Sequence, residues 1–217
     1  MANDKLNQRA KLRNGNSTLN SAKYSSANTD EWYTNYDTIA EELSHYKNQF
    51  KGKIVLCNCD DPYESNFCYY FLRHFNQLNL KKLICTSYAG SKIDKIHENI
   101  QLTLKLVDDY GEPILVGQGY VLTVSKMPGN IGDEVSDEVI AEVLTKKNTV
   151  KRLHGNGDFR SEECIEYLKE CDICCTNPPF SLFTDLFSLL VKYDKKYLLI
   201  GNQNAITYKT NYKKSRW

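Results

Sequence analysis

The stretch KIVLCNCDDPYESNFCYYFLRHFNQL, residues 53–78, changes its hydrophobic period partway along. Its first part, residues 53–59, is a short apolar run typical of a buried strand. Apolar side chains at the spacing of one helix face follow: Phe67, Phe71 and Phe75. Asp61 can cap a helix and Pro62 suits the first helical position. The stretch therefore predicts a strand that leads directly into a helix.

The same alternation continues along the chain. Further strands are predicted in KKLICTSYAG (81–90), VKRLHG (150–155), CDICCT (171–176) and KKYLLIG (195–201). Helical patterns are found at 37–50, 134–145, 161–170 and 181–193. Strands that alternate with helices and are buried throughout predict an α/β protein with a doubly wound, mostly parallel sheet. Period-two alternation at about 100–125, around a turn at Gly111, predicts an inserted hairpin outside that sheet.

Composition bounds the class of protein. The 217 residues, 41% hydrophobic and 25% charged, are enough for one domain of ordinary size. The formal net charge of +1 neither supports nor excludes a DNA partner. No apolar run approaches the roughly 20 residues of a membrane span, and the N-terminus lacks a signal-peptide core, so we expect a cytoplasmic protein without membrane contact. Residues 1–28 are polar and without hydrophobic period, which predicts a disordered arm, more a solvated tail than a phosphate-binding one.

Eight cysteines raise the question of metal or disulfides. Six lie in apolar strand-like runs: Cys57, Cys59, Cys85, Cys171, Cys174 and Cys175. In a reducing cytosol such residues are usually small buried hydrophobes. Cys171 and Cys174 have the spacing of metal ligands, but no second pair follows and the histidines are scattered. We therefore predict core packing, and no metal site.

Two prolines end the strand predicted at 171–176. Proline lacks an N–H and restricts the residue before it, so Asn177-Pro178-Pro179 forms a stiff elbow. Ligands of doubly wound sheets bind at the carboxyl ends of the strands. The polar residues that fall there are Asn58, Asp60, Asp61, Asp158 and Asn177. From these residues alone, a rigid turn at the elbow, a helix cap at Asp61 and a surface turn at Asp158 remain open alternatives.

Three separated stretches carry a family resemblance. They are TDEWYTNY (29–36), LCNCDDPYESNFCYYF (56–71) and DICCTNPPFSLF (172–183). Together they resemble the EcoRI-type adenine-specific DNA methyltransferases, and LLIGNQNAITYK (198–209) fits the same family. The resemblance covers residues 29–209, which are expected to be a catalytic domain of the Rossmann-like methyltransferase type. Two features depart from related folds: no glycine follows the first strand, and the second ends in Thr86-Ser87 without an acidic residue.

The resemblance implies a site-specific adenine-N6 methyltransferase of a restriction-modification system. Such an enzyme transfers a methyl group from S-adenosylmethionine to an adenine flipped out of double-stranded DNA. The Asn177 side-chain oxygen and the Pro178 carbonyl are the implied acceptors for the target amine, held in place before reaction. Pro179 stiffens the elbow, and Phe180 offers a ring on which the base stacks. We expect no obligate protein partner.

The resemblance also implies a set of cofactor-binding residues. They are Tyr33, Thr34, Asn58, Asp60, Asp61 and Asp158. Tyr33 and Thr34 are expected near the methionine end of the donor, and the acidic pair Asp60-Asp61 near its ammonium group. Asp158, after a glycine-containing loop, is expected to accept a hydrogen bond from the donor's adenine. Without the resemblance, residues 30–34 could equally be the entry to a helix.

The last part of the chain raises the question of whether the chain is shorter than the implied fold. The chain stops eight residues after NAITYK, in a basic tail at residues 210–217. The implied fold normally continues into a β-hairpin and a target-recognition region, so we expect a sheet truncated after its fifth strand. Two alternatives follow: an inactive remnant that binds S-adenosylmethionine or DNA weakly, or an RNA or protein methyltransferase with the same Asn-Pro-Pro-Phe motif.

Overall fold

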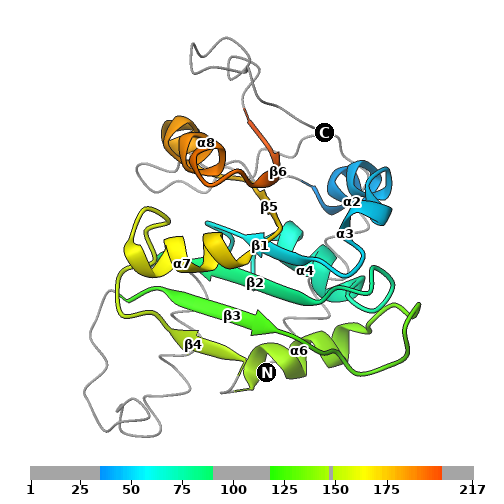
Figure 1. The fold of residues 1–217 in the computed structure, drawn as a ribbon. Coiled ribbons are helices and arrows are strands. Elements are labelled where there is room, and N and C mark those ends of the chain that lie inside the picture. The colour runs from blue at the N-terminus through cyan, green and yellow to red at the C-terminus, as the bar shows by residue number, and fades with distance from the viewer. Residues whose placement is uncertain (1–34, 90–117, 147–148, 202–217) are drawn as a thin grey trace, which may run out of the picture.

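The computed structural model describes residues 35–89, 118–146 and 149–201. They form a six-stranded sheet with helices on both faces (Figure 1). The strands are β1 (Ile54–Cys57), β2 (Lys82–Ser87), β3 (Tyr120–Val124), β4 (Val150–Arg152), β5 (Ile173–Thr176) and β6 (Lys196–Leu199). The helices are α2 (Tyr36–Ser44), α3 (Lys47–Phe50), α4 (Asn66–Arg73), α6 (Asp137–Thr145), α7 (Glu162–Glu170) and α8 (Phe183–Lys192), with a short 3-10 helix, η1 (Phe180–Leu182).

The strand order is β4-β3-β2-β1-β5-β6. Strands β2, β1, β5 and β6 run parallel, while β3 is antiparallel to both of its neighbours, β2 and β4. The predicted α/β class with a doubly wound, mostly parallel sheet is therefore confirmed. Because the central strands are parallel, their carboxyl ends meet at one edge, which is where such folds bind ligands.

The predicted hairpin at 100–125 is wrong in its second half. Residues 120–124 form β3, which pairs with β2 from Ser87↔Tyr120 to Leu83↔Val124 and lies inside the sheet. Its side chains are buried on both faces: Tyr120, Leu122 and Val124 belong to one core cluster and Val121 to the other. The period-two alternation indicated a strand correctly, but alternation alone cannot tell an inserted strand from a separate hairpin. The first half of that prediction, the arm at 1–28 and the tail at 210–217 lie outside the described residues.

Two helix predictions also need correction. The predicted helix at 37–50 is two helices, α2 and α3, separated at His45 and Tyr46. The predicted cap at Asp61 is not the cap of α4, because Ser65 occupies that position and its Oγ accepts a hydrogen bond from Cys68 N at 3.2 Å. Asp61 Oδ1 instead accepts from Tyr63 N at 2.7 Å, and this local turn delays the helix by one turn.

The core has two parts, one on each face of the sheet. On one face α2, α3, α4 and α6 pack against side chains such as Val55, Cys57 and Leu83. On the other face α7 and α8 pack against Leu56 and Ile84. This alternation along β1 explains its continuous apolar sequence, because both faces are covered.

The cysteines lie mainly in this core, as predicted. Seven are buried, Cys59 is partly buried, and all eight are free thiols. Burial raises the pKa of Cys57 and of Cys171 to about 12, so both are neutral thiols at pH 7. Cys171 and Cys174, the pair with metal-like spacing, pack in the same apolar cluster as Leu168.

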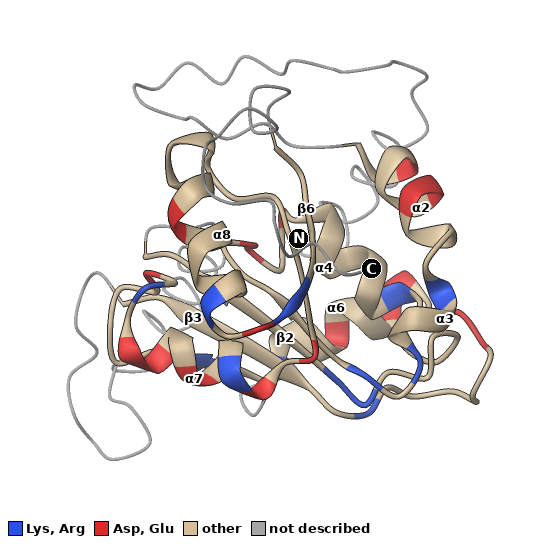
Figure 2. Ribbon diagram, turned by 45° about the horizontal axis from the view of Figure 1, so that its top comes forward, with Lys and Arg blue, Asp and Glu red and all other residues tan. Residues whose placement is uncertain are grey.

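The outer surface carries mixed charge. Figure 2 shows acidic and basic residues along α7, where Lys169 pairs with Glu166 at 2.6 Å. Within the described ranges, no helix is both long and apolar enough to cross a membrane.

Candidate cofactor and target-base site

Buried polar residues gather at the carboxyl ends of β1, β2 and β5. Six of the eight buried polar or charged residues in the described part of the chain are here: Asn58, Asp60, Ser65, Thr86, Ser87 and Thr176. Burying a polar group is unfavourable unless it is hydrogen-bonded, so such groups do not collect in one place without a partner or a role. This edge of the sheet is therefore the candidate functional site.

Asp60 connects three elements that surround this site. Its Oδ1 accepts a hydrogen bond from Ser65 Oγ at 2.6 Å, and its Oδ2 accepts one from Thr176 Oγ1 at 2.6 Å. Its backbone N–H donates to the Thr86 carbonyl at 3.0 Å. Ser65 caps α4, Thr86 lies in β2 and Thr176 ends β5. A single buried residue thus ties the loop after β1 to all three, to α4 and β5 through its carboxylate and to β2 through its backbone N–H.

Two polar atoms at the site have no protein partner in the described structure. Asn58 is fully buried, and its Oδ1 accepts a hydrogen bond from Thr86 Oγ1 at 2.6 Å. Its Nδ2 finds no acceptor among the described residues, and neither does Ser87 Oγ find a partner there. A buried polar group without a partner costs about 1–3 kcal/mol. Two such groups lie at the ends of adjacent strands, where a bound ligand could complete their hydrogen bonding.

The loop after β1 contains a backbone conformation that explains the missing glycine. Cys59 has φ 64°, in the left-handed region that glycine usually occupies. A residue in the left-handed region therefore follows the first strand here, and it is a cysteine where glycine would adopt that conformation more easily. Strain of this kind in a non-glycine residue is typical of functional sites.

The elbow follows β5 directly. Asn177 is half-buried, Pro178 is buried and Phe180 is half-buried. Pro179 is extended, with φ −53° and ψ 136°, and its carbonyl accepts a hydrogen bond from Leu182 N at 2.9 Å. The chain then enters η1 and α8, so the elbow lies between a buried strand and a helix, as the two prolines predicted.

Asp158 follows a loop that lies beside the end of β2, and its neighbour Asn156 contacts the two residues that follow that strand. Asn156 O accepts a hydrogen bond from Ala89 N at 2.8 Å, and Asn156 Nδ2 donates to Tyr88 Oη at 3.2 Å. The Asp158 carboxylate is bound by Arg160, whose Nη2 is 2.7 Å from Oδ2 and whose Nε is 3.0 Å from Oδ1. This guanidinium lowers the pKa of the Asp158 carboxyl.

Arg160 also reaches α8, because its Nη1 is 3.0 Å from Asp185 Oδ2. The ion pairs Asp158–Arg160–Asp185 therefore link the loop after β4 to the helix that follows the elbow. All three side chains are partly exposed, so these pairs contribute little to stability. They matter for the predicted role of Asp158. The carboxylate that is expected to accept a hydrogen bond from the donor's adenine is already paired with Arg160.

The structure brings together most of the predicted site residues. Asn58, Asp60 and Asp61 share the loop after β1, and the hydrogen bond from Thr176 to Asp60 joins this loop to the elbow. Asp158 is near the end of β2 instead, paired with Arg160. Tyr33 and Thr34 lie outside the described residues.

Sequence reasoning missed several residues of this site. They are Ser65, Thr86, Ser87, Tyr88, Arg160 and Thr176. Most are hydroxyl residues, which are common throughout proteins and give no pattern of their own. One signal was available in the sequence, because Thr176 directly precedes the elbow. The position of Tyr88 after the end of β2 and its 56% exposure appear only in the structure.

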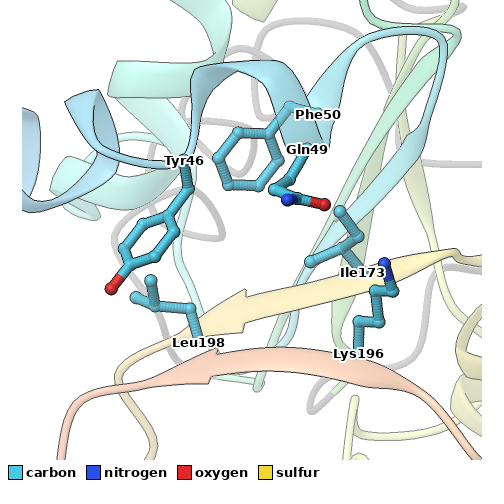
Figure 3. Close-up of a pocket in the computed structure, with 6 residues that line it drawn as sticks. All are labelled: Tyr46, Gln49, Phe50, Ile173, Lys196 and Leu198. Carbon is cyan, nitrogen blue, oxygen red and sulfur yellow. The ribbon is translucent and has the colours of Figure 1, made fainter. Parts of the chain in front are cut away.

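A hollow lies away from this site, between α3 and strands β5 and β6 (Figure 3). It is lined by Tyr46, Gln49, Phe50, Ile173, Lys196 and Leu198. Ile173 and Lys196 are the first residues of their strands, so the hollow is near the amino ends of the sheet. Its lining is mainly apolar, and it shares no residue with the carboxyl-end site.

A parallel sheet with polar residues at its carboxyl ends and an Asn-Pro-Pro-Phe elbow after β5 defines a Rossmann-like fold of the methyltransferase type. The family model described as "Adenine-specific methyltransferase EcoRI" matches residues 18–216. The chain therefore belongs to the EcoRI-type adenine-specific methyltransferase family.

Two curated relatives show the extent of the match. The chain is 39% identical over 196 residues to "Type II methyltransferase M.EcoRI" of Escherichia coli, covering 89% of this chain and 51% of the relative. It is 35% identical over 187 residues to "Type II methyltransferase M.MpnI" of Mycoplasma pneumoniae, covering 86% of this chain and 45% of the relative. The chain thus spans about half the length of these relatives. The comparison with solved structures gave no significant match.

Proposed function

We propose that this chain carries the catalytic site of a DNA adenine-N6 methyltransferase of a restriction-modification system. Its substrates are S-adenosylmethionine and double-stranded DNA. Membership of the family supports this proposal, as do the relatives' names, which describe Type II methyltransferases. The observation that carries it is the pair of buried atoms without partners, Asn58 Nδ2 and Ser87 Oγ, at the edge of the sheet that also carries the elbow.

The cofactor fits the chemistry of this edge. Its methionine part offers a carboxylate that accepts hydrogen bonds, which suits Asn58 Nδ2, and an ammonium group, which suits the partly exposed Asp61. Its ribose hydroxyls suit Ser87 Oγ at the end of β2. We assign Asp158 to its adenine, so that the amine of the adenine shares this carboxylate with Arg160. Asp60 contributes negative charge, although both of its oxygens accept protein hydroxyls.

Two further assignments come from the family resemblance alone. Tyr33 and Thr34, which precede α2, are assigned to the methionine end of the cofactor. Bound there, the cofactor supplies a methyl group on a sulfonium that needs no further activation. The protein's contribution is then mainly to position the two reactants.

The elbow performs the chemistry on the target base. The adenine amine is a weak nucleophile, because its lone pair is delocalised into the ring. Asn177 Oδ1 and the Pro178 carbonyl accept one hydrogen bond each from this amine and draw its nitrogen towards tetrahedral geometry. These acceptors are held in place by a stiff backbone, so little reorganisation is needed at the moment of reaction. Phe180 stacks on the flipped base.

The alternatives have less support. The family match and the names of the relatives, which describe Type II methyltransferases, favour an active enzyme over an inactive remnant. An RNA or protein methyltransferase would share the elbow, but the matched relatives are named as Type II methyltransferases.

Replacing Asn58 by Ala tests the cofactor assignment. We expect the affinity for S-adenosylmethionine to fall about tenfold or more, because the variant removes a buried donor that the ligand satisfies. The matched control is Asn76→Ala, which removes a buried asparagine whose Nδ2 donates to the Pro128 carbonyl at 2.8 Å, away from the site. Calorimetric titration measures both affinities, and thermal melting shows whether each variant is folded. Equal affinities in a folded Asn58→Ala variant and wild type would contradict the assignment.

A further inference from the structure

The hydroxyl of Thr176 lies at the point where β5 separates from β1. The ladder between these strands has the pairs Val55↔Ile173 and Leu56↔Cys174, whereas the ladder between β5 and β6 continues to Thr176↔Leu199. On the β1 side the end of β5 is therefore attached through a side chain. Thr176 Oγ1 lies 2.6 Å from Asp60 Oδ2 and also contacts the Asn58 carbonyl.

This contact has a defined direction. The Asp60 carboxylate and the Asn58 carbonyl can only accept, so Thr176 Oγ1 is the donor in both contacts. Thr176 is fully buried and Asp60 is 5% exposed, so water does not compete for this bond. Hydrogen bonds to a buried charged group are among the stronger ones in proteins.

The other contacts of Asp60 make it a rigid anchor. Ser65 Oγ donates to its Oδ1 at 2.6 Å, and its own N–H donates to the Thr86 carbonyl at 3.0 Å. Ser65 is in turn fixed as the cap of α4, where its Oγ accepts from Cys68 N. Rotation of the Asp60 carboxylate would therefore break its hydrogen bonds with two buried hydroxyls, those of Ser65 and Thr176.

We propose that Thr176 and Asp60 are positioning residues for the elbow. Asn177 follows Thr176 directly in the chain. Fixing the threonine side chain therefore fixes the start of the backbone that carries the Asn177 side-chain amide and the Pro178 carbonyl. The same anchor belongs to the loop that we assign to the cofactor, so it sets the distance between methyl donor and acceptor. This inference rests on the proposed function of the elbow, and it gives Asp60 a role that acts through Thr176.

The variant Thr176→Val tests this role, because valine keeps the shape of threonine and lacks the hydroxyl. Thr176→Ser is the matched control, since serine keeps the hydroxyl. Hydrogen exchange of residues 180–182, followed by mass spectrometry, reports the mobility of the elbow without requiring turnover. We expect exchange there to rise about fivefold or more in the valine variant and to stay within about twofold of wild type in the serine variant. Exchange of residues 54–57 in β1 should be unchanged in both.

Cofactor affinity and turnover complete the test. In Thr176→Val we expect turnover to fall about tenfold or more, while the dissociation constant for S-adenosylmethionine changes less than about threefold. Thr176→Ser should restore turnover. The positioning role would be overturned if residues 180–182 exchanged in the valine variant at the wild-type rate. It would also be overturned if exchange in β1 rose as much as exchange at residues 180–182. A wild-type chain that neither binds the cofactor nor transfers a methyl group would instead refute the proposed function, and the exchange comparison would still decide the positioning role.

Discussion

Replacing Asn177 by Ala is expected to reduce methyl-transfer turnover by roughly 100-fold or more, with little change in affinity for S-adenosylmethionine. The variant removes one of the two acceptors proposed for the target amine and leaves the Pro178 carbonyl in place. Removing one preorganised polar group in a site shielded from water typically has an effect of this size. Asn177 does not supply the hydrogen bonds that we assign to the cofactor, so binding of the donor should persist.

The measurement is methyl transfer to duplex DNA under saturating cofactor. It is made with the chain alone and with the chain extended by the remainder of M.EcoRI, because this chain spans about half of that relative. The control is Asn130→Ala, which removes an exposed loop asparagine that bonds to Asp133. Turnover like wild type in a folded Asn177→Ala variant would show that the elbow does not act on the target amine.

Gly157→Ala is expected to destabilise the protein by about 3 kcal/mol. Gly157 has φ 82°, which L side chains rarely adopt, and an added Cβ would be 2.2 Å from the Ser87 carbonyl oxygen. That oxygen is backbone at the end of β2, so it cannot turn aside as a flexible side chain could. Either the end of β2 or the loop must shift, and either shift changes the position of Asp158 relative to Ser87.

A neighbouring glycine provides the control. A Cβ at Gly155 would meet no atom within 4 Å, so Gly155→Ala should change the free energy of unfolding by less than about 0.5 kcal/mol. Urea unfolding measures both variants, and a loss of 3 kcal/mol corresponds to a melting temperature lower by roughly 10 °C for a domain of this size. If Gly157→Ala were as stable as Gly155→Ala, the close packing of this loop on β2 would be refuted.

The sequence predicted the parts of the fold that depend on continuous hydrophobic patterns. Strands β1, β2 and β5 are apolar runs, and their pattern was sufficient because both faces of the sheet are covered there. Strand β6 was also predicted, although none of its residues is fully buried. Strand β3 was recognised as a strand but misplaced. Its position between β2 and β4 depends on contacts between distant segments, and no local pattern encodes such contacts.

Local competition explains the errors at helix ends. Asp61 has the residue type of a cap, but its carboxylate binds Tyr63 N in a turn, and Ser65 becomes the cap of α4. Both residues are good caps in isolation, and in the fold Ser65 also donates to Asp60 Oδ1, a contact that local sequence does not reveal. The sequence contains both candidates but does not show which one is used.

The candidate site was predictable in its conspicuous residues only. The prolines of the elbow identify Asn177, and the acidic pair after β1 identifies Asp60 and Asp61. The resemblance assigned Asp60 to the cofactor, which stays a prediction, and the structure adds that its oxygens accept hydrogen bonds from Ser65 and Thr176. These contacts join three segments of the chain, so finding them required the folded structure.

The most direct test of the proposed function is to identify the methylated product. The chain, extended as above, is incubated with duplex DNA and S-adenosylmethionine labelled in its methyl group, and the DNA is digested to nucleosides and separated by chromatography. We predict that the label appears in N6-methyladenine and that Asn177→Ala abolishes most of it. Label in a methylated cytosine, or no label in DNA from a folded chain that binds the cofactor, would contradict the proposal.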